Sequence, residues 1–198
     1  LQSGPTTLSN FRVNNILKGL AFPLAKERTL DYVDDLRNLP PEILGHNFDL
    51  FAINTDRNRD HGVQDYNSLR SAYGLKRYST FEEIFEDEMD RFILEKSYNS
   101  VDNIDSYVGI LGEHKLEGSL YGELGATIAG EQFKNIRDGD RFWYEYAFPP
   151  EIVAEIKATS ITDIILRNTD IKNMPVNGFF CHNCTVEWEK MIDWIYYN

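Results

Sequence analysis

The stretch DLFAINTDRNRDHG, residues 49–62, carries the most specific arrangement of side chains in this 198-residue chain. Residues 48–59 have the composition of a largely buried helix that ends near Gly62. Asn54 and Arg57 are three residues apart, so on a helix their side chains share one face. An amide and a guanidinium on the same face of an apolar helix need polar partners, because burying them without partners costs free energy. The partner of Arg57 is then a carboxylated ligand or an Asp or Glu of this protein, and the spacing alone favours the internal ion pair.

Apolar periodicity outside this stretch predicts a mainly α protein with many short helices and long loops. No sustained period-two alternation occurs, which argues against a sheet. Pro23 should kink or end the first helix, and Thr80 and Glu83 have the spacing of a capping box that opens a helix with an acidic, solvated face. The expected helical ranges are 11–26, 29–36, 48–59, 80–93, 103–111, 120–136 and 150–157, with a last amphipathic segment at 188–195.

The charge balance excludes several classes of partner. The chain has 20 Lys and Arg against 32 Asp and Glu, a net charge of −12 at pH 7. Nucleic-acid binding depends on neutralising phosphates, and an anionic membrane surface would repel this chain. No apolar run reaches the ~20 residues that a membrane-spanning helix needs, and residues 1–7 do not have the pattern of a signal peptide.

Spacing does not indicate a metal site. None of the zinc-enzyme spacings occurs among the histidines, which are His46, His61, His114 and His182. Cys181 and Cys184 form one C-x-x-C, which fits half a zinc site, a redox pair or half of an unrelated disulfide. No second ligand pair lies at a usable spacing, so we predict that these thiols do not bind zinc. The Asp138-Gly139 pair predicts a turn closed by ion pairs rather than a calcium loop, because the other calcium-ligand positions are missing.

The run LFAINTDRNRDHGVQDYN, residues 50–67, resembles the L-N-x-x-R-x-R-D-H-G segment of the animal haem peroxidases, and the Arg70 and Gly74-Leu75 that follow also match. Further matching blocks come in the order of the family: ILKGL at 16–20, NID at 103–105 with Gly109, GEQF to RDGDRFWYE at 130–145, and II-x-x-NT at 164–169. The resemblance covers about residues 11–185. It identifies residues 1–198 as the C-terminal portion of a haem peroxidase domain, with 186–198 as an amphipathic C-terminal tail.

The resemblance implies part of a mainly helical fold that oxidises a small donor substrate with hydrogen peroxide through a bound haem. By position, Asn54 would accept a hydrogen bond from the ring N–H of the histidine that binds the iron, and Arg57 would contact a haem propionate. The family's catalytic histidines and arginine, its calcium loop and its haem-esterifying acids all precede the matched region. We therefore expect no catalytic residue and no metal ligand in this chain, and haem binding only together with the remaining peroxidase polypeptide.

The functional hypothesis is a segment of a haem-dependent peroxidase, an oxidoreductase, that supplies the proximal-side wall of the haem pocket. The alternative is a catalytically inactive, truncated peroxidase-like module for binding or adhesion, and the four blocks in order disfavour an unrelated helical interaction domain. The resemblance also implies an extracellular, secreted protein and a response to oxidative stress, in which case Asn183-Cys184-Thr185 would be a glycosylation sequon. Many family members pair cysteines at the positions of Tyr73 and Thr127, and Leu166 replaces the usual partner of Cys184, so these pairings are lost here.

Overall fold

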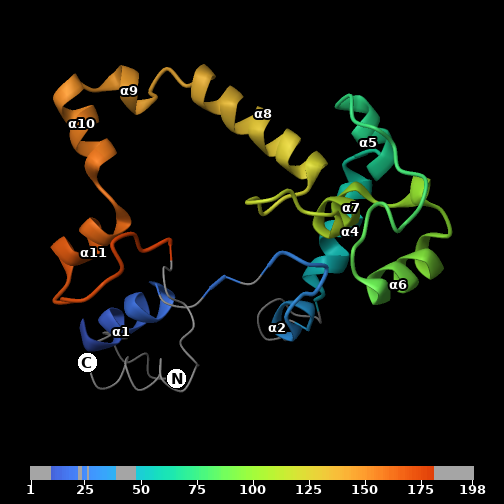
Figure 1. Ribbon diagram of the computed structural model, residues 1–198, viewed down its shortest axis with the longest axis horizontal. Helices are drawn as coiled ribbons and strands as arrows, with labels where there is room; N and C mark the ends of the chain where they lie inside the picture. The colour runs from blue at the N-terminus through green and yellow to red at the C-terminus, as the bar shows by residue number, and fades with distance from the viewer. Residues whose placement is uncertain (1–9, 22–23, 26, 39–47, 181–198) are drawn as a thin grey trace. The chain divides into compact units, whose positions relative to one another are not determined.

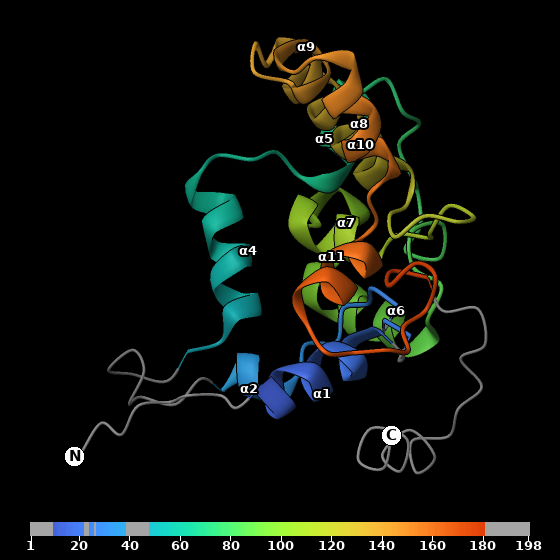
Figure 2. The ribbon, with the colours of Figure 1, turned by 90° about the vertical axis from the view of Figure 1, so that its left-hand side faces the viewer.

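The computed structural model describes residues 10–21, 24–25, 27–38 and 48–180 (Figures 1 and 2). These residues are mainly helical, as predicted, and their β pairing is limited to isolated bridges. The chain divides into two compact units, residues 1–26 with 141–198 and residues 27–140. Unit 1 contains α1 (Asn10–Ala21), α9 (Tyr144–Ala147), α10 (Pro150–Ala158) and α11 (Ile161–Asn168). Unit 2 contains α2 (Asp34–Arg37), α4 (Leu50–Asp60), α5 (Tyr66–Ala72), α6 (Glu88–Tyr98), η1 (Val101–Asn103), α7 (Ser106–Gly112) and α8 (Glu123–Gly139).

Helix α4 forms where the sequence predicts it. The Asp49 side chain caps its first turn by accepting hydrogen bonds from the backbone N–H groups of Phe51 and Ala52, at 2.9 and 3.1 Å. The chain leaves α4 through Gly62, whose φ of +66° is a conformation that glycine adopts without strain. The predicted burial is wrong, because no residue of α4 is buried. The helix packs on α7 and α2, and its residues are half-buried or exposed.

The single helix predicted over 80–93 is also wrong. The capping box itself is present: the Glu83 N–H donates to Thr80 Oγ1 at 3.3 Å, and the Thr80 N–H donates to Glu83 Oε2 at 3.2 Å. Only a turn follows, because Phe85 pairs with Glu113 in an isolated antiparallel bridge. Helix α6 starts afresh at Glu88, where the Asp87 side chain caps the first turn.

The core of unit 2 explains this break. Its buried apolar side chains come from the turn after Thr80 and from α5, α6, η1, α7 and α8, and they are Tyr66, Phe81, Ile84, Phe85, Leu94, Val101, Ile104, Val108 and Leu124. A continuous 80–93 helix would place Phe81, Phe85 and Phe92 on one face. Instead Phe81 and Phe85 are buried while Phe92 is 58% exposed, so core packing overrides the local periodicity.

Three further boundaries differ from the sequence predictions. Helix α1 ends at Ala21, two residues before Pro23. The Thr29 hydroxyl accepts from the backbone N–H of Asp31 in a turn, and α2 begins only at Asp34. Helix α8 continues through Asp138 and Gly139, so the predicted turn there is wrong, although Arg137 and Asp138 do form an ion pair at 2.7 Å. The segments 186–198 and 188–195 lie outside the described residues.

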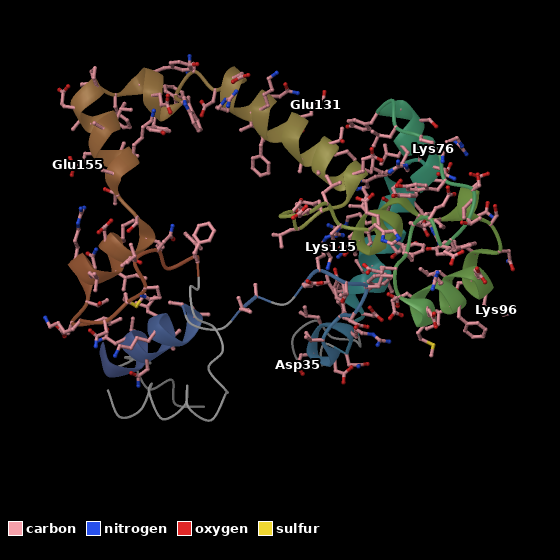
Figure 3. All side chains as sticks on the ribbon, in the orientation of Figure 1. Asp35, Lys76, Lys96, Lys115, Glu131 and Glu155 are labelled. Atoms are coloured by element: carbon pink, nitrogen blue, oxygen red, sulfur yellow. The ribbon has the colours of Figure 1, made fainter. Side chains whose placement is uncertain are left out.

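Most charged side chains of the described residues lie on the outside of the two units. Figure 3 labels five that are exposed, namely Asp35, Lys76, Lys96, Glu131 and Glu155. In α8 the first turn is buried through Leu124 and Gly125, whereas Phe133 further along is 71% exposed. None of the helices formed by the described residues has the length and apolar content to cross a membrane.

Candidate functional site

The amide of Asn54 is oriented by a tyrosine of a neighbouring helix. Asn54 is half-buried on α4 on the side of α7, and its Nδ2 donates a hydrogen bond to Tyr107 Oη at 3.1 Å. Tyr107 Oη is also hydrogen-bonded to the hydroxyl of Tyr32, which lies in the segment before α2. Among the described residues, Asn54 Oδ1 has no hydrogen bond. The amide therefore has its donor side occupied and its acceptor side available for another group.

Aromatic packing holds the two tyrosines in place. The Phe51 ring, one turn before Asn54, meets the Tyr32 ring edge-on with centroids 5.3 Å apart and the Tyr107 ring at 5.7 Å. Burial and the hydrogen bond with Tyr32 raise the pKa of Tyr107 to about 12, although the hydrogen bond from Asn54 acts in the opposite direction. The Tyr107 hydroxyl therefore keeps its proton at neutral pH.

Arg57 lies one turn after Asn54 on the same face of α4, and its side chain is exposed. In the part of the chain that the structure describes, its guanidinium forms no ion pair and no hydrogen bond. The internal carboxylate that the spacing favoured is therefore not found there. The cation that joins α4 to the core is Arg59, to which the sequence analysis assigned no role.

Arg59 and Asp105 clamp α4 against the start of α7. The guanidinium of Arg59 donates Nε to Asp105 Oδ1 at 2.9 Å and Nη2 to Oδ2 at 2.7 Å, and Tyr98 donates its hydroxyl to the same Oδ2 at 2.7 Å. Burial alone would raise the pKa of Asp105, but the hydrogen bonds from Arg59 and Tyr98 outweigh it and the pKa is lowered. This clamp fixes the spacing between the helices that carry Asn54 and Tyr107.

The other motif residues after α4 build the core. Arg70 is fully buried and pairs with Glu123 at 2.5 Å, with its guanidinium over the Tyr78 ring at 4.0 Å. Glu113 is buried too, accepting the Tyr66 hydroxyl at 2.7 Å and the backbone N–H groups of the first turn of α8. These contacts give the tyrosine and arginine of the YN-x-x-R block a structural role.

The cavity beside α4 is a separate feature from the two predicted site residues. A cavity of about 500 Å³ lies between α4 and α6, with Phe51, Tyr32 and Arg59 in its wall. Neither Asn54 nor Arg57 lines it. Among the described residues, Asn54 Oδ1 and the Arg57 guanidinium have no hydrogen-bond partner, so both are available to a group from another segment or to a ligand.

The chemistry of Asn54 and Arg57 suits an iron-binding histidine and a haem propionate. A free amide acceptor and an exposed guanidinium on one face suit an imidazole N–H and a propionate. No group of three or more metal-binding side chains occurs in the described residues. His61 ends α4 and the His114 ring contacts the backbone oxygen of Glu82 at 3.4 Å, so neither is bonded to Asn54. His46, His182, Cys181 and Cys184 lie outside the described residues.

Comparison with known proteins shows to which family this chain belongs. The family model of the animal haem peroxidases matches residues 2–179, and the chain belongs to this family.

Two relatives and one solved structure illustrate the similarity. Peroxinectin A of Dictyostelium discoideum is 38% identical over 161 residues, which cover 81% of this chain and 30% of that protein. Lactoperoxidase of Mesocricetus auratus is 35% identical over 179 residues, 84% of this chain and 25% of that protein. The solved structure of peroxidase A from D. discoideum superposes with a TM-score of 0.76 at 37% identity, covering 84% of this chain and 33% of that chain. The chain thus spans a third or less of these proteins.

Proposed function

We propose that this chain forms the proximal-side wall of the haem pocket in a haem-dependent peroxidase. The orientation of the Asn54 amide carries the proposal. Because Tyr107 occupies Nδ2, Oδ1 is free to accept a hydrogen bond from the ring N–H of an iron-binding histidine that another segment contributes. Such an acceptor fixes the orientation of the histidine and raises its basicity.

Arg57 is proposed to hold a haem propionate. Its exposed guanidinium, one helical turn from Asn54 and without an internal partner in the described residues, supports this role. A charge-assisted hydrogen bond of this kind contributes about 1.5–3 kcal/mol to binding. When bound, haem would supply the oxidation of a donor substrate by hydrogen peroxide, while the residues of this chain hold and orient it.

Family membership supports the remaining parts of the proposal. We take residues 1–198 as the C-terminal portion of the domain, acting together with the remaining peroxidase polypeptide. The oxidant would be hydrogen peroxide, the reductant a small donor molecule, and the location extracellular. The chain covers 25–33% of these relatives, and we propose that it acts together with the remaining polypeptide.

The test uses the full-length protein that carries this segment. Asn54→Ala should keep haem bound but loosen the histidine, with a loss of roughly 10–100-fold in affinity or activity. Arg57→Ala should speed haem dissociation while the melting temperature of the haem-free protein stays unchanged. Arg77→Ala, which removes another surface arginine of unit 2, is the control and should leave haem dissociation unaltered.

Two results would contradict the proposal. If Arg57→Ala lowers the melting temperature and leaves haem dissociation unchanged, Arg57 has a structural partner and not a propionate. If the purified full-length protein binds no haem, the alternative of an inactive binding or adhesion module is correct.

A further inference from the structure

We propose that Tyr107, supported by Tyr32, is a positioning residue of the haem pocket, whose hydroxyl holds the Asn54 amide with its carbonyl oxygen toward the iron-binding histidine. The inference rests on the proposed function and deepens it. The resemblance to the family assigns no role to either tyrosine. Both come from segments far from Asn54 in sequence: Tyr107 is 53 residues away, and Tyr32 is 75 residues from Tyr107.

The Tyr107 hydroxyl orients the Asn54 amide in this structure. A phenol has one proton to donate, whereas its oxygen can also accept. Asn54 Nδ2 donates to Tyr107 Oη, and either oxygen can be the donor in the contact between the Tyr107 and Tyr32 hydroxyls. As part of the proposal we assign the Tyr107 proton to Tyr32, which leaves Tyr107 Oη as an acceptor that suits Nδ2 and not Oδ1. With this assignment the tyrosine pair keeps Oδ1 free.

The supports of the pair are rigid. Tyr107 lies between Ser106 and Val108, which are both buried, and the Ser106 hydroxyl donates to the backbone oxygen of Gln64. The Phe51 ring contacts the rings of both tyrosines. A side chain held by fixed backbone and aromatic contacts loses little further entropy when it orients its partner. The raised pKa of Tyr107 means that the hydroxyl does not ionise at neutral pH.

The consequence is a measurable change at the histidine. A well-oriented acceptor draws the imidazole N–H and gives the iron ligand more anionic character, which lowers the reduction potential of the iron. Removing the Tyr107 hydroxyl frees the amide to rotate, so the acceptor is correctly placed for a smaller part of the time. Tyr107→Phe should therefore raise the potential and lower the iron–histidine stretching frequency, by less than Asn54→Ala does, and Tyr32→Phe should give a smaller shift in the same direction.

The experiment compares Tyr107→Phe with Tyr144→Phe in the haem-loaded full-length protein. Tyr144 is a matched control, because it is also half-buried and its hydroxyl makes a hydrogen bond, at 2.9 Å to Glu145 rather than to Asn54. We expect Tyr107→Phe to shift the potential and the stretching frequency, and Tyr144→Phe to leave both unchanged. NMR of the haem-free protein adds a second readout, in which the Nδ2 protons of Asn54 shift toward free-amide values only in Tyr107→Phe.

The outcomes separate this inference from the function on which it rests. If Asn54→Ala shifts the iron–histidine frequency and Tyr107→Phe does not, the positioning role of Tyr107 is wrong. The proposal that this chain forms the proximal-side wall of the haem pocket is then unaffected. If Asn54→Ala itself leaves the frequency unchanged, the proposed contact between Asn54 and the histidine is wrong. If Tyr144→Phe shifts the frequency as much as Tyr107→Phe, the effect is a general consequence of removing a tyrosine hydroxyl, and the positioning role of Tyr107 is wrong as well.

Discussion

Replacing Gly109 with alanine tests the packing that holds Tyr107 in place. Gly109 is buried on α7 where this helix crosses α5. A Cβ atom at this position would lie 2.9 Å from Cβ of Tyr66 and closer still to Cγ and Cδ2 of its ring. Carbon atoms in contact prefer about 3.5–4.0 Å. One of the two helices must move to make room.

The Tyr66 side chain has no room to retreat, which determines the magnitude. It is fully buried, its hydroxyl donates to Glu113 at 2.7 Å, and its backbone N–H donates to the oxygen of Ile104 at 2.8 Å. Overpacking of a core costs about 1–3 kcal/mol, and with three anchors on Tyr66 we expect the upper end. Alanine recovers about 1 kcal/mol over glycine within a helix. The expected loss in free energy of unfolding is therefore about 2 kcal/mol.

Urea unfolding followed by circular dichroism measures this loss, and Gly130→Ala is the control. Gly130 lies in α8, is exposed, and has no heavy atom within 4 Å of the position that a Cβ would occupy. The same substitution there should raise the free energy of unfolding by up to about 1 kcal/mol. The two variants should thus shift stability in opposite directions. A Gly109→Ala protein as stable as the parent would refute the close contact between α5 and α7.

Two other predictions concern the buried charges. Because the pKa of Asp105 is lowered on folding, its stabilising contribution is present above the unfolded value of about 3.9 and is lost as pH falls through the lower folded value. Asp105→Asn should therefore flatten the decline of the urea-unfolding free energy below about pH 4, and an unchanged slope would contradict the Arg59 clamp. Arg70→Ala leaves Glu113 buried without its nearby cation, so we expect the free energy of unfolding to fall by about 3–5 kcal/mol in the same assay. A fall of less than about 1 kcal/mol would show that the Arg70–Glu113 pair does not stabilise the core.

Much of the local structure follows from the sequence by itself. The helical class, the position of α4 and the shared face of Asn54 and Arg57 depend on residues within one or two turns of each other. The capping box of Thr80 and Glu83 forms as its spacing predicts. The motif blocks identify the family, which the comparisons confirm. Helical periodicity and capping can be predicted from the sequence because the interacting groups are close to each other along the chain.

The tertiary structure decided which groups meet across long stretches of sequence. Spacing favoured an internal partner for Arg57, whereas the structure pairs Arg59 with Asp105, 46 residues away, and orients Asn54 through Tyr107. The helix expected over 80–93 is interrupted for the same reason. These outcomes depend on which apolar side chains fill the core of unit 2, and burial is a property of the whole packed unit. Partners brought together by burial have no spacing rule, and therefore only the folded chain specifies them.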